Sequence, residues 1–263
     1  MARLTKAEWK AHAEAEKILA QDHLTDDERQ FVLTHWQESA NHVNSSASAF
    51  FTPVSLALDV ALFAGVSGGS RKVVDLCAGI GALGLAAWWR SDCRAEITCI
   101  EVNPDYVAVG RKLFPEARWI CADINDLPAG LGRFDCAIAN PPFGRMTRIS
   151  GPRYRGVSDL AVVDIASDLA DWGTFILPGS SVPFQYSGRP MYREQDSSAY
   201  RAFREVTQIE LSAESIDCAV YDGWHGVRPQ IEMVSADFTE ARRARRGKET
   251  AGIPAADLFS WAA

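Results

Sequence analysis

The chain has 263 residues, of which 47% are hydrophobic, so its composition is globular and its length suits one α/β domain with a full core. A net charge of -7 argues against bulk attraction to nucleic acid, so any such contact must rest on a local basic patch. No apolar stretch could span a membrane and residues 1–10 contain no signal-peptide core. We therefore expect a cytoplasmic protein with no membrane partner.

The six cysteines form no C-x-x-C pair, and several fall in expected buried strands. This pattern favours small hydrophobic side chains in a reduced cytoplasm over a disulfide framework or a zinc site. The cysteines are Cys77, Cys93, Cys99, Cys121, Cys136 and Cys218.

Two helices are predicted within residues 6–41. The first has helical spacing of apolar residues between Ala7 and Leu19, and the second follows Thr25, a suitable cap with acids in the first turn. A Ser/Asn/Ala-rich linker follows at 41–49.

From Phe50 onward, short apolar runs alternate with helical segments, which predicts a parallel sheet with helices on both faces. The expected strands are 72–77, 96–101, 118–122, 134–139 and 173–178. The expected helices are 82–90, 104–112 and 160–171.

Two further strands, 208–212 and 230–236, are expected to end the sheet in antiparallel fashion, giving a mostly parallel seven-stranded α/β fold. A basic helix and a loose tail follow. We therefore divide the chain into an N-terminal helical extension (1–44), a main domain (45–238) and a basic C-terminal tail (239–263).

The first strand runs into a glycine loop in which Gly79, Gly81 and Gly84 satisfy G-x-G-x-x-G. The pattern permits a dinucleotide site, with phosphate at the helix N-terminus, or a site for S-adenosylmethionine. Asp75 lies just upstream, where a carboxylate suits a ligand with an ammonium group and would repel a pyrophosphate. The acid therefore favours S-adenosylmethionine over a nicotinamide cofactor.

Acids also end the next two expected strands. Glu101 can accept both ribose hydroxyls of either cofactor, and Asp123 can accept from an adenine amino group between Val102 and Ile124. Each acid alone could be ordinary strand-end solvation. Their joint placement beside a glycine loop favours a nucleoside-binding site.

The fourth expected strand ends in Asn140-Pro141-Pro142-Phe143. Two prolines make a rigid turn and keep the preceding Asn out of the helical region. Asn140 Oδ1 and the Pro141 carbonyl can each accept a hydrogen from a planar amine, and Phe143 can stack on its ring. The alternative is a strand-terminating turn with a solvated Asn.

Upstream of the first strand lies Phe51-Thr52-Pro53, which is also compatible with a simple helix start. Together with the glycine loop, the strand-end acids and the Asn140–Phe143 turn, it resembles the motifs of class I S-adenosylmethionine-dependent adenine-N6 DNA methyltransferases. The motif order is that of the gamma subgroup, and the resemblance covers about residues 45–180.

The resemblance implies a Rossmann-like fold, S-adenosylmethionine as cofactor with S-adenosylhomocysteine as product, no metal, and a flipped adenine in DNA as substrate. The implied catalytic residues are Asn140, Pro141, Pro142 and Phe143. The implied cofactor-binding residues are Phe51, Thr52, Pro53, Asp75, Cys77, Ala78, Gly79, Gly81, Leu83, Glu101, Val102, Asp123, Ile124 and Asn140.

A local run of arginines after Phe143 is expected to grip phosphates beside the flipped base, although a solvated loop would look similar. The resemblance adds Trp224, in the expected turn between the last two strands, as an aromatic against that base. Arg189 and Arg193 form a second candidate, whereas the arginines of the C-terminal helix are better explained as a solvated face. The run comprises Arg145, Arg148, Arg153 and Arg155.

The sheet is expected to finish near Phe238, which leaves no room for the separate target-recognition domain usual in this family. Either the target is very short or relaxed and is read through the loops, or a specificity subunit supplies recognition; the N-terminal helices could instead form a homodimer or partner surface. Alternatives that remain open are an RNA adenine or guanine amino methyltransferase, a protein glutamine methyltransferase, and a non-catalytic subunit. Roles in restriction-modification, phage self-protection and regulatory marking are equally compatible with the sequence.

Overall fold

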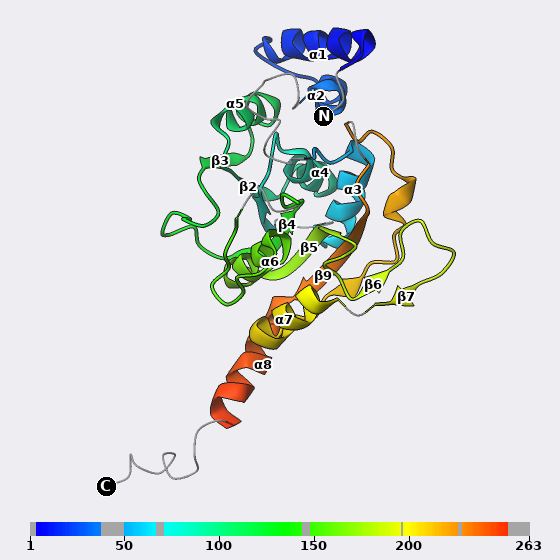
Figure 1. Cartoon of the computed structure of the whole chain (residues 1–263). Helices are drawn as coiled ribbons and strands as arrows, with labels where there is room; N and C mark the ends of the chain where they lie inside the picture. The colour runs from blue at the N-terminus through cyan, green and yellow to red at the C-terminus, as the bar shows by residue number, and fades with distance from the viewer. Residues whose placement is uncertain are drawn as a thin grey trace.

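The computed structural model describes residues 4–37, 50–66, 71–143, 148–195, 197–225 and 228–251. Within them, seven strands form one sheet in the order β3-β2-β1-β4-β5-β9-β8 (Figure 1). The first five run parallel, whereas β9 is antiparallel to both β5 and β8. The predicted α/β fold with an antiparallel ending is confirmed. The strands are β1 Lys72–Leu76, β2 Glu96–Glu101, β3 Arg118–Cys121, β4 Phe134–Ala139, β5 Ala170–Pro178, β8 Ser212–Ala213 and β9 Ile231–Asp237.

Helices cover both faces of the sheet because its strands bury side chains on both sides. Val73 of β1 packs with one core cluster, and its neighbour Val74 packs with the other. On the first face lie α3 Val54–Phe63, α4 Ala82–Arg90 and α5 Pro104–Leu113; on the second lie α6 Ser158–Leu169, α7 Ser198–Thr207 and α8 Phe238–Ala251.

Two predicted boundaries after β4 are wrong. The helix expected at 160–171 is α6, which ends at Leu169, and β5 begins at Ala170 instead of residue 173. Ala170 pairs in register with Phe134 of β4, so sheet pairing overrides the helical pattern of the last residues.

The strand expected at 208–212 is also wrong, because α7 runs to Thr207 and Gln208 caps it in a left-handed conformation. Only Ser212–Ala213 pairs with β9. The segment 179–200, which carries the second candidate pair Arg189 and Arg193, contains a small hairpin, β6 Phe184–Gln185 and β7 Arg193–Glu194, as well as the start of α7.

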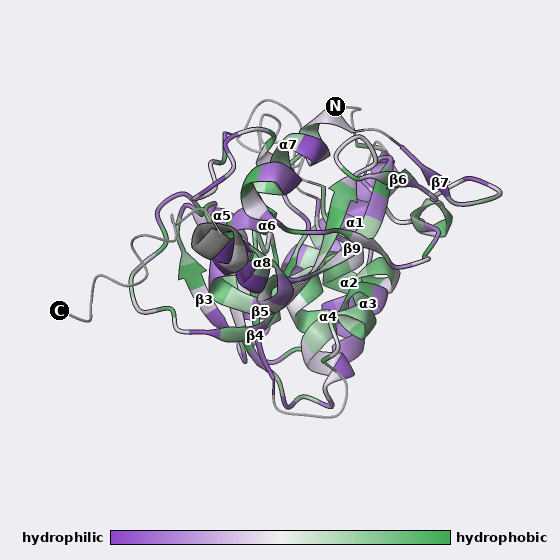
Figure 2. Cartoon of the chain, turned by 90° about the horizontal axis from the view of Figure 1, so that it is seen from below, coloured by the Kyte–Doolittle hydropathy of each residue, from purple (hydrophilic) through white to green (hydrophobic). Residues whose placement is uncertain are grey.

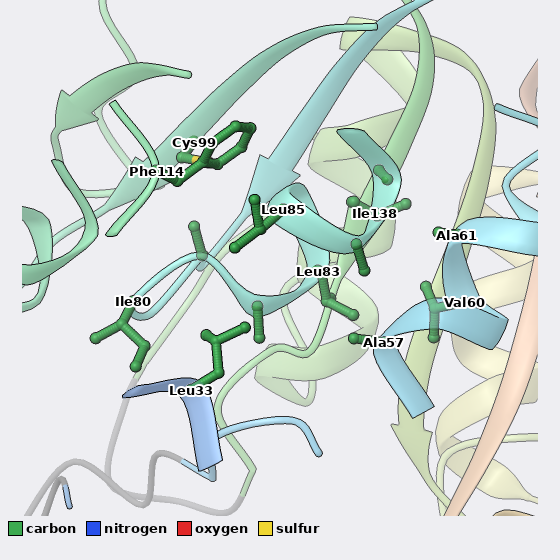
Figure 3. Close-up of a cluster of buried hydrophobic side chains, with 14 of the residues drawn as sticks. Leu33, Ala57, Val60, Ala61, Ile80, Leu83, Leu85, Cys99, Phe114 and Ile138 are labelled. Carbon is green, nitrogen blue, oxygen red and sulfur yellow. The ribbon is translucent and has the colours of Figure 1, made fainter. Parts of the chain in front are cut away.

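The two N-terminal helices are confirmed as α1 Lys6–Leu19 and α2 Asp26–His35, each begun by a Thr–Glu capping box. They pack on the main domain: Arg29 donates to both oxygens of Glu116, at 3.1 and 2.7 Å. Figure 3 shows Leu33 of α2 beside Ile80 of the glycine loop. The extension therefore shares the core of the main domain. The predicted linker at 41–49 lies outside the described residues.

All six cysteines are free thiols. Cys99, Cys136 and Cys218 are buried as expected for small hydrophobic side chains, whereas Cys93 and Cys121 are exposed. No helix in the described part of the chain is both long and apolar enough to cross a bilayer.

Candidate functional site

The glycine loop joins β1 to α4 in a tight, left-handed path. Cys77, Gly79 and Gly81 all have positive φ, at 61°, 57° and 95°. A side chain at Gly81 would also approach Trp119 to 2.9 Å, so only glycine fits there. The loop is fastened to β2, because the Gly79 amide donates to Glu101 Oε2 at 2.8 Å.

Asp75 lies beneath this loop and is fully buried. Its Oδ2 accepts a hydrogen bond from the Gly84 amide at 2.8 Å, while its Oδ1 has no partner among the described residues. Burial raises the pKa of Asp75 to about 8. Asp75 does not line the neighbouring cavity, so the structure does not bring it to the surface where a ligand ammonium was expected.

Glu101 ends β2 at the cavity wall. Its two oxygens accept from the Gly79 and Asn103 amides, each at 2.8 Å, and burial raises the pKa of this carboxyl against the effect of those amides. A carboxylate oxygen has two lone pairs, so each oxygen that already accepts from an amide retains capacity for a further donor.

Asp123 follows β3 at the same edge of the sheet and lines the same cavity. Its Oδ1 accepts from the amide and the side chain of Asn125. Val102 is 60% exposed and Ile124 is buried, and both line the cavity as expected for walls around a flat ring. No group of three His, Cys, Asp or Glu side chains in the described ranges could hold a metal ion.

The cavity has a volume of about 400 Å³, within the range typical of small-molecule sites. It lies at the carboxyl ends of β1 to β4, where ligands bind in open α/β sheets. A hollow of about 30 Å³ adjoins it. The predicted residues that line one or both are Thr52, Cys77, Ala78, Gly79, Leu83, Glu101, Val102, Asp123, Ile124, Asn140, Pro142 and Arg148.

Asn140 is the side chain that links the two sequence motifs. Its Nδ2 donates to the Phe50 carbonyl at 2.8 Å and to Thr52 Oγ1 at 3.0 Å. Because a carbonyl can only accept, these contacts fix which end of the amide faces Thr52. Asn140 Oδ1 is buried and has no donor among the described residues. The site therefore holds an oriented, unsatisfied acceptor.

Phe143 lies beside Phe50, with ring centroids 5.9 Å apart and planes at 30°. Pro141 is buried, whereas Phe143 and Pro142 remain partly exposed. Phe51 packs against the glycine loop, since a side chain at Gly79 would come within 3.2 Å of its ring. The two motifs predicted from sequence thus meet at one wall.

The expected arginine run is divided by the structure. Arg148 is exposed and lines the cavity, and Arg155 is exposed. Arg153 instead pairs with the fully buried Asp164 at 2.9 Å and with Asp168 at 2.5 Å, so we correct its assignment from phosphate contact to the anchoring of its loop on α6. Arg145 lies outside the described residues.

The turn between β8 and β9 lies where the sequence predicts it, but it packs against α2 and the segment that precedes α3. A side chain at Gly223 would meet Pro53, and His225 Nε2 lies 3.0 Å from the Thr34 carbonyl of α2. Trp224 is half-buried against the core, with its Nε1 buried and lacking an acceptor in the described structure. It does not line the cavity, so its contact with a base stays a prediction.

Sequence reasoning missed several cavity residues. Phe50 directly precedes the recognised Phe51-Thr52-Pro53 element, and Tyr106 lies in the first turn of the helix after Glu101; position relative to a motif was the available signal for both. Asn125 and Ile149 come together only in the fold, through the bond from the Ser150 amide to Asn125 Oδ1.

Residues 73–150 match the family model described as a methyltransferase domain. This range covers β1, the glycine loop, both strand-end acids and the Asn140 turn. No curated protein matches the chain closely enough to count as a relative.

Solved structures share the fold at low sequence identity. A candidate class I S-adenosylmethionine-dependent methyltransferase from Listeria monocytogenes has a TM-score of 0.57 at 12% identity, covering 89% of this chain and 75% of that one. A type I restriction-modification methyltransferase subunit from Streptococcus thermophilus has a TM-score of 0.53 at 14% identity, covering 82% of this chain and 50% of that one. A candidate RNA methyltransferase from Pyrococcus horikoshii has a TM-score of 0.51 at 17% identity, covering 81% of this chain and 98% of that one. The chain thus has the class I methyltransferase fold.

Proposed function

We propose that this protein transfers a methyl group from S-adenosylmethionine to the N6 amino group of adenine in DNA. The observation that carries the proposal is Asn140 Oδ1, a buried acceptor that has no donor among the described residues, held in place by two bonds from its own Nδ2. A buried polar atom without a partner is costly, so its retention at a cavity wall indicates a ligand donor.

The cavity fits the cofactor. Glu101 would accept from the ribose hydroxyls, the amide-rich loop at Gly79 would border the methionine part, and Val102 and Ile124 would enclose the adenine ring beside Asp123. When bound, the sulfonium group supplies an activated methyl group.

Asn140 would act on the target amine. An exocyclic amine on an aromatic ring is a poor nucleophile because its lone pair is delocalised. A preorganised acceptor at Asn140 Oδ1 accepts a hydrogen bond from the amine and stabilises the positive charge that develops on its nitrogen. The bonds to Phe50 and Thr52 hold that acceptor still, so little reorganisation is needed during reaction.

The direct link between Asn140 and Thr52 supports an adenine-N6 DNA enzyme, because it joins the Asn140–Phe143 turn to the Phe51-Thr52-Pro53 element, which resembles a motif of that family. Phe143, whose ring is tilted by 30° from that of Phe50, offers a ring surface to a flipped base. Among the structural neighbours, one is a restriction-modification subunit and another a candidate RNA methyltransferase, so RNA is the second substrate to be tested.

The test is labelled-methyl transfer to duplex DNA, single-stranded DNA, RNA and protein, followed by identification of the modified nucleoside. We expect N6-methyladenine in DNA. Transfer to RNA alone would replace the substrate, and no transfer to any acceptor would favour a non-catalytic subunit.

Two variants test the role of the amide. Asn140→Ala should lower turnover by about 100- to 1000-fold, the usual cost of losing one transition-state hydrogen bond, while cofactor binding measured by calorimetry survives. Thr52→Val keeps the acceptor but removes one of its two supports, so we expect a smaller loss. Wild-type turnover in Asn140→Ala would rule out the assignment.

A further inference from the structure

A short arm projects from the carboxyl edge of the sheet after β5. It consists of residues 184–194, with β6 and β7 paired as Phe184↔Glu194 and Gln185↔Arg193 and a polar tip between them. Figure 1 shows this hairpin standing away from the main sheet, and Figure 2 shows its tip as hydrophilic. The motifs of the cofactor site do not involve it.

Buried polar groups hold the arm in place. The carboxylate of Glu232, 4% exposed, accepts from the Tyr186 amide at 2.8 Å, the Ser187 amide at 3.0 Å and the Ser187 hydroxyl at 2.7 Å. Gln195 Nε2 donates to the Val182 and Phe184 carbonyls at 2.7 and 3.1 Å. These contacts make the arm a fixed projection and also satisfy the Glu232 carboxylate internally.

An aromatic platform occupies the base of the tip. The Tyr192 ring stacks on Phe184, with centroids 5.6 Å apart and planes at 24°. Phe184 is buried, while Tyr192 is 49% exposed and its neighbour Met191 is 70% exposed. One face of Tyr192 is thus supported by the core, and the ring remains accessible for a second stacking partner.

The charge of the arm favours an anionic partner. Arg189 and Arg193 are exposed and form no ion pair among the described residues, and Glu194 is the one acid in the arm. The nearby Asp217 is engaged by the Gly188 amide at 2.7 Å. The exposed surface therefore combines two cations with an aromatic ring, the combination that binds nucleic-acid strands.

The arm borders a cavity of about 790 Å³ that reaches the end of β5 and the start of β9. Arg189 and Arg228 line it, and Arg228 is held by Asp222 at 3.4 Å. Because β5 runs parallel to β4 and pairs with it, this cavity opens on the same edge of the sheet as Asn140. The arm and Asn140 therefore lie on the same side of the sheet.

We propose that the arm holds the DNA strand next to the target adenine, with Tyr192 stacked on an unpaired base and Arg189 and Arg193 on its phosphates. This inference rests on the proposed function. It gives the described part of the chain a DNA-holding element built from an insertion after β5.

The test measures DNA binding in an Asn140→Ala background, so that affinity is separated from turnover. Random-sequence single-stranded and duplex DNA serve as probes over a salt series. Tyr192→Ala should weaken single-strand binding by about 5- to 150-fold, the range for loss of one base–aromatic stack. Arg189→Ala should reduce the slope of log affinity against log salt by about one.

Arg118→Ala is the matched control, because this exposed arginine begins β3 at the opposite edge of the sheet. It should leave affinity unchanged. Binding unaffected by both Tyr192→Ala and Arg189→Ala would overturn the inference. A change of oligomeric state in Tyr192→Ala on size-exclusion chromatography would overturn it in favour of a protein interface.

Methyl transfer by the otherwise wild-type chain separates the two proposals. If DNA is methylated and the KM for DNA is the same in the arm variants, the arm inference fails and the proposed function stands. If the wild-type chain methylates no DNA, the proposed function itself fails.

Discussion

The two halves of the carboxyl edge are built differently. The half over β1, β2 and β3 is a cavity of about 400 Å³ whose wall includes acids held by neighbouring backbone amides. The half over β5 and β9 is an opening of about 790 Å³ formed by a hairpin and a turn inserted between strands. Parallel strands thus define the first half, and insertions define the second. Binding of cofactor and of target should therefore be separable by mutation.

The largest effect is expected for the stability of the protein, through Asp75 beneath the glycine loop of the cofactor half. Asp75 has a folded-state pKa of about 8 against an ordinary value of 3.8, so the folded state keeps a proton that the unfolded chain releases. Stability should therefore fall as pH rises from about 4 to about 8, by up to about 1.4 kcal/mol per pH unit from this group.

Denaturant unfolding across this pH range measures the effect. Asp75→Asn should flatten the dependence of the unfolding free energy on pH, because it removes the titrating group. A wild-type curve parallel to that of the variant would mean that Asp75 is not the source. If cofactor affinity falls together with stability at high pH, protonated Asp75 also supports the cofactor site.

Glu101→Gln should weaken S-adenosylmethionine binding by about 10- to 150-fold, the equivalent of losing a hydrogen bond to a charged group. Its carboxylate lines the cofactor cavity and holds Gly79. Calorimetry with the cofactor measures this loss, and DNA affinity should not change. An equal loss of both affinities would break the division between the halves.

Gln195→Ala is the counterpart in the target half. It removes the bonds from Gln195 Nε2 to the Gly179, Val182 and Phe184 carbonyls and so loosens the arm. We expect DNA binding to weaken about threefold to tenfold, since an intramolecular hydrogen bond contributes about 0.5–1.5 kcal/mol. Cofactor affinity should stay constant; if it drops instead, the arm also supports the first cavity.

The smallest effect is expected for Arg243→Ala, an exposed arginine on α8 that belongs to neither half. Stability should change by less than about 0.5 kcal/mol, as is usual for exposed positions, and both affinities should be unchanged. A loss of DNA binding in a filter assay would mean that α8 also contributes to the surface that binds DNA.

The cofactor half was largely predictable because its signals are local. The bounds of β4 and α4 agree with the sequence prediction, and the strand-end positions of Glu101 and Asp123 follow from the apolar runs before them. Local propensity and sheet pairing point the same way there, so pattern and structure coincide.

The target half was less predictable because long-range contacts decide it. Arg153 looked like a free cation in a basic loop, yet it pairs with Asp164 and Asp168 on α6. The arm has two-residue strands, too short to show an alternating pattern, and it is held by Glu232 from a distant strand. Nothing near 184–194 in the sequence signals that partner.

The hydrogen bonds of Asn140 also constrain when the site can form during folding. They join residues 90 and 88 positions apart in the chain, so they require β4 to have docked beside β1 and the segment before α3 to have closed over both. A nascent chain that ends before β4 has the glycine loop but no oriented amide. Assembly of the reactive wall is therefore a non-local event, and we expect it to report on the docking of β4 beside β1.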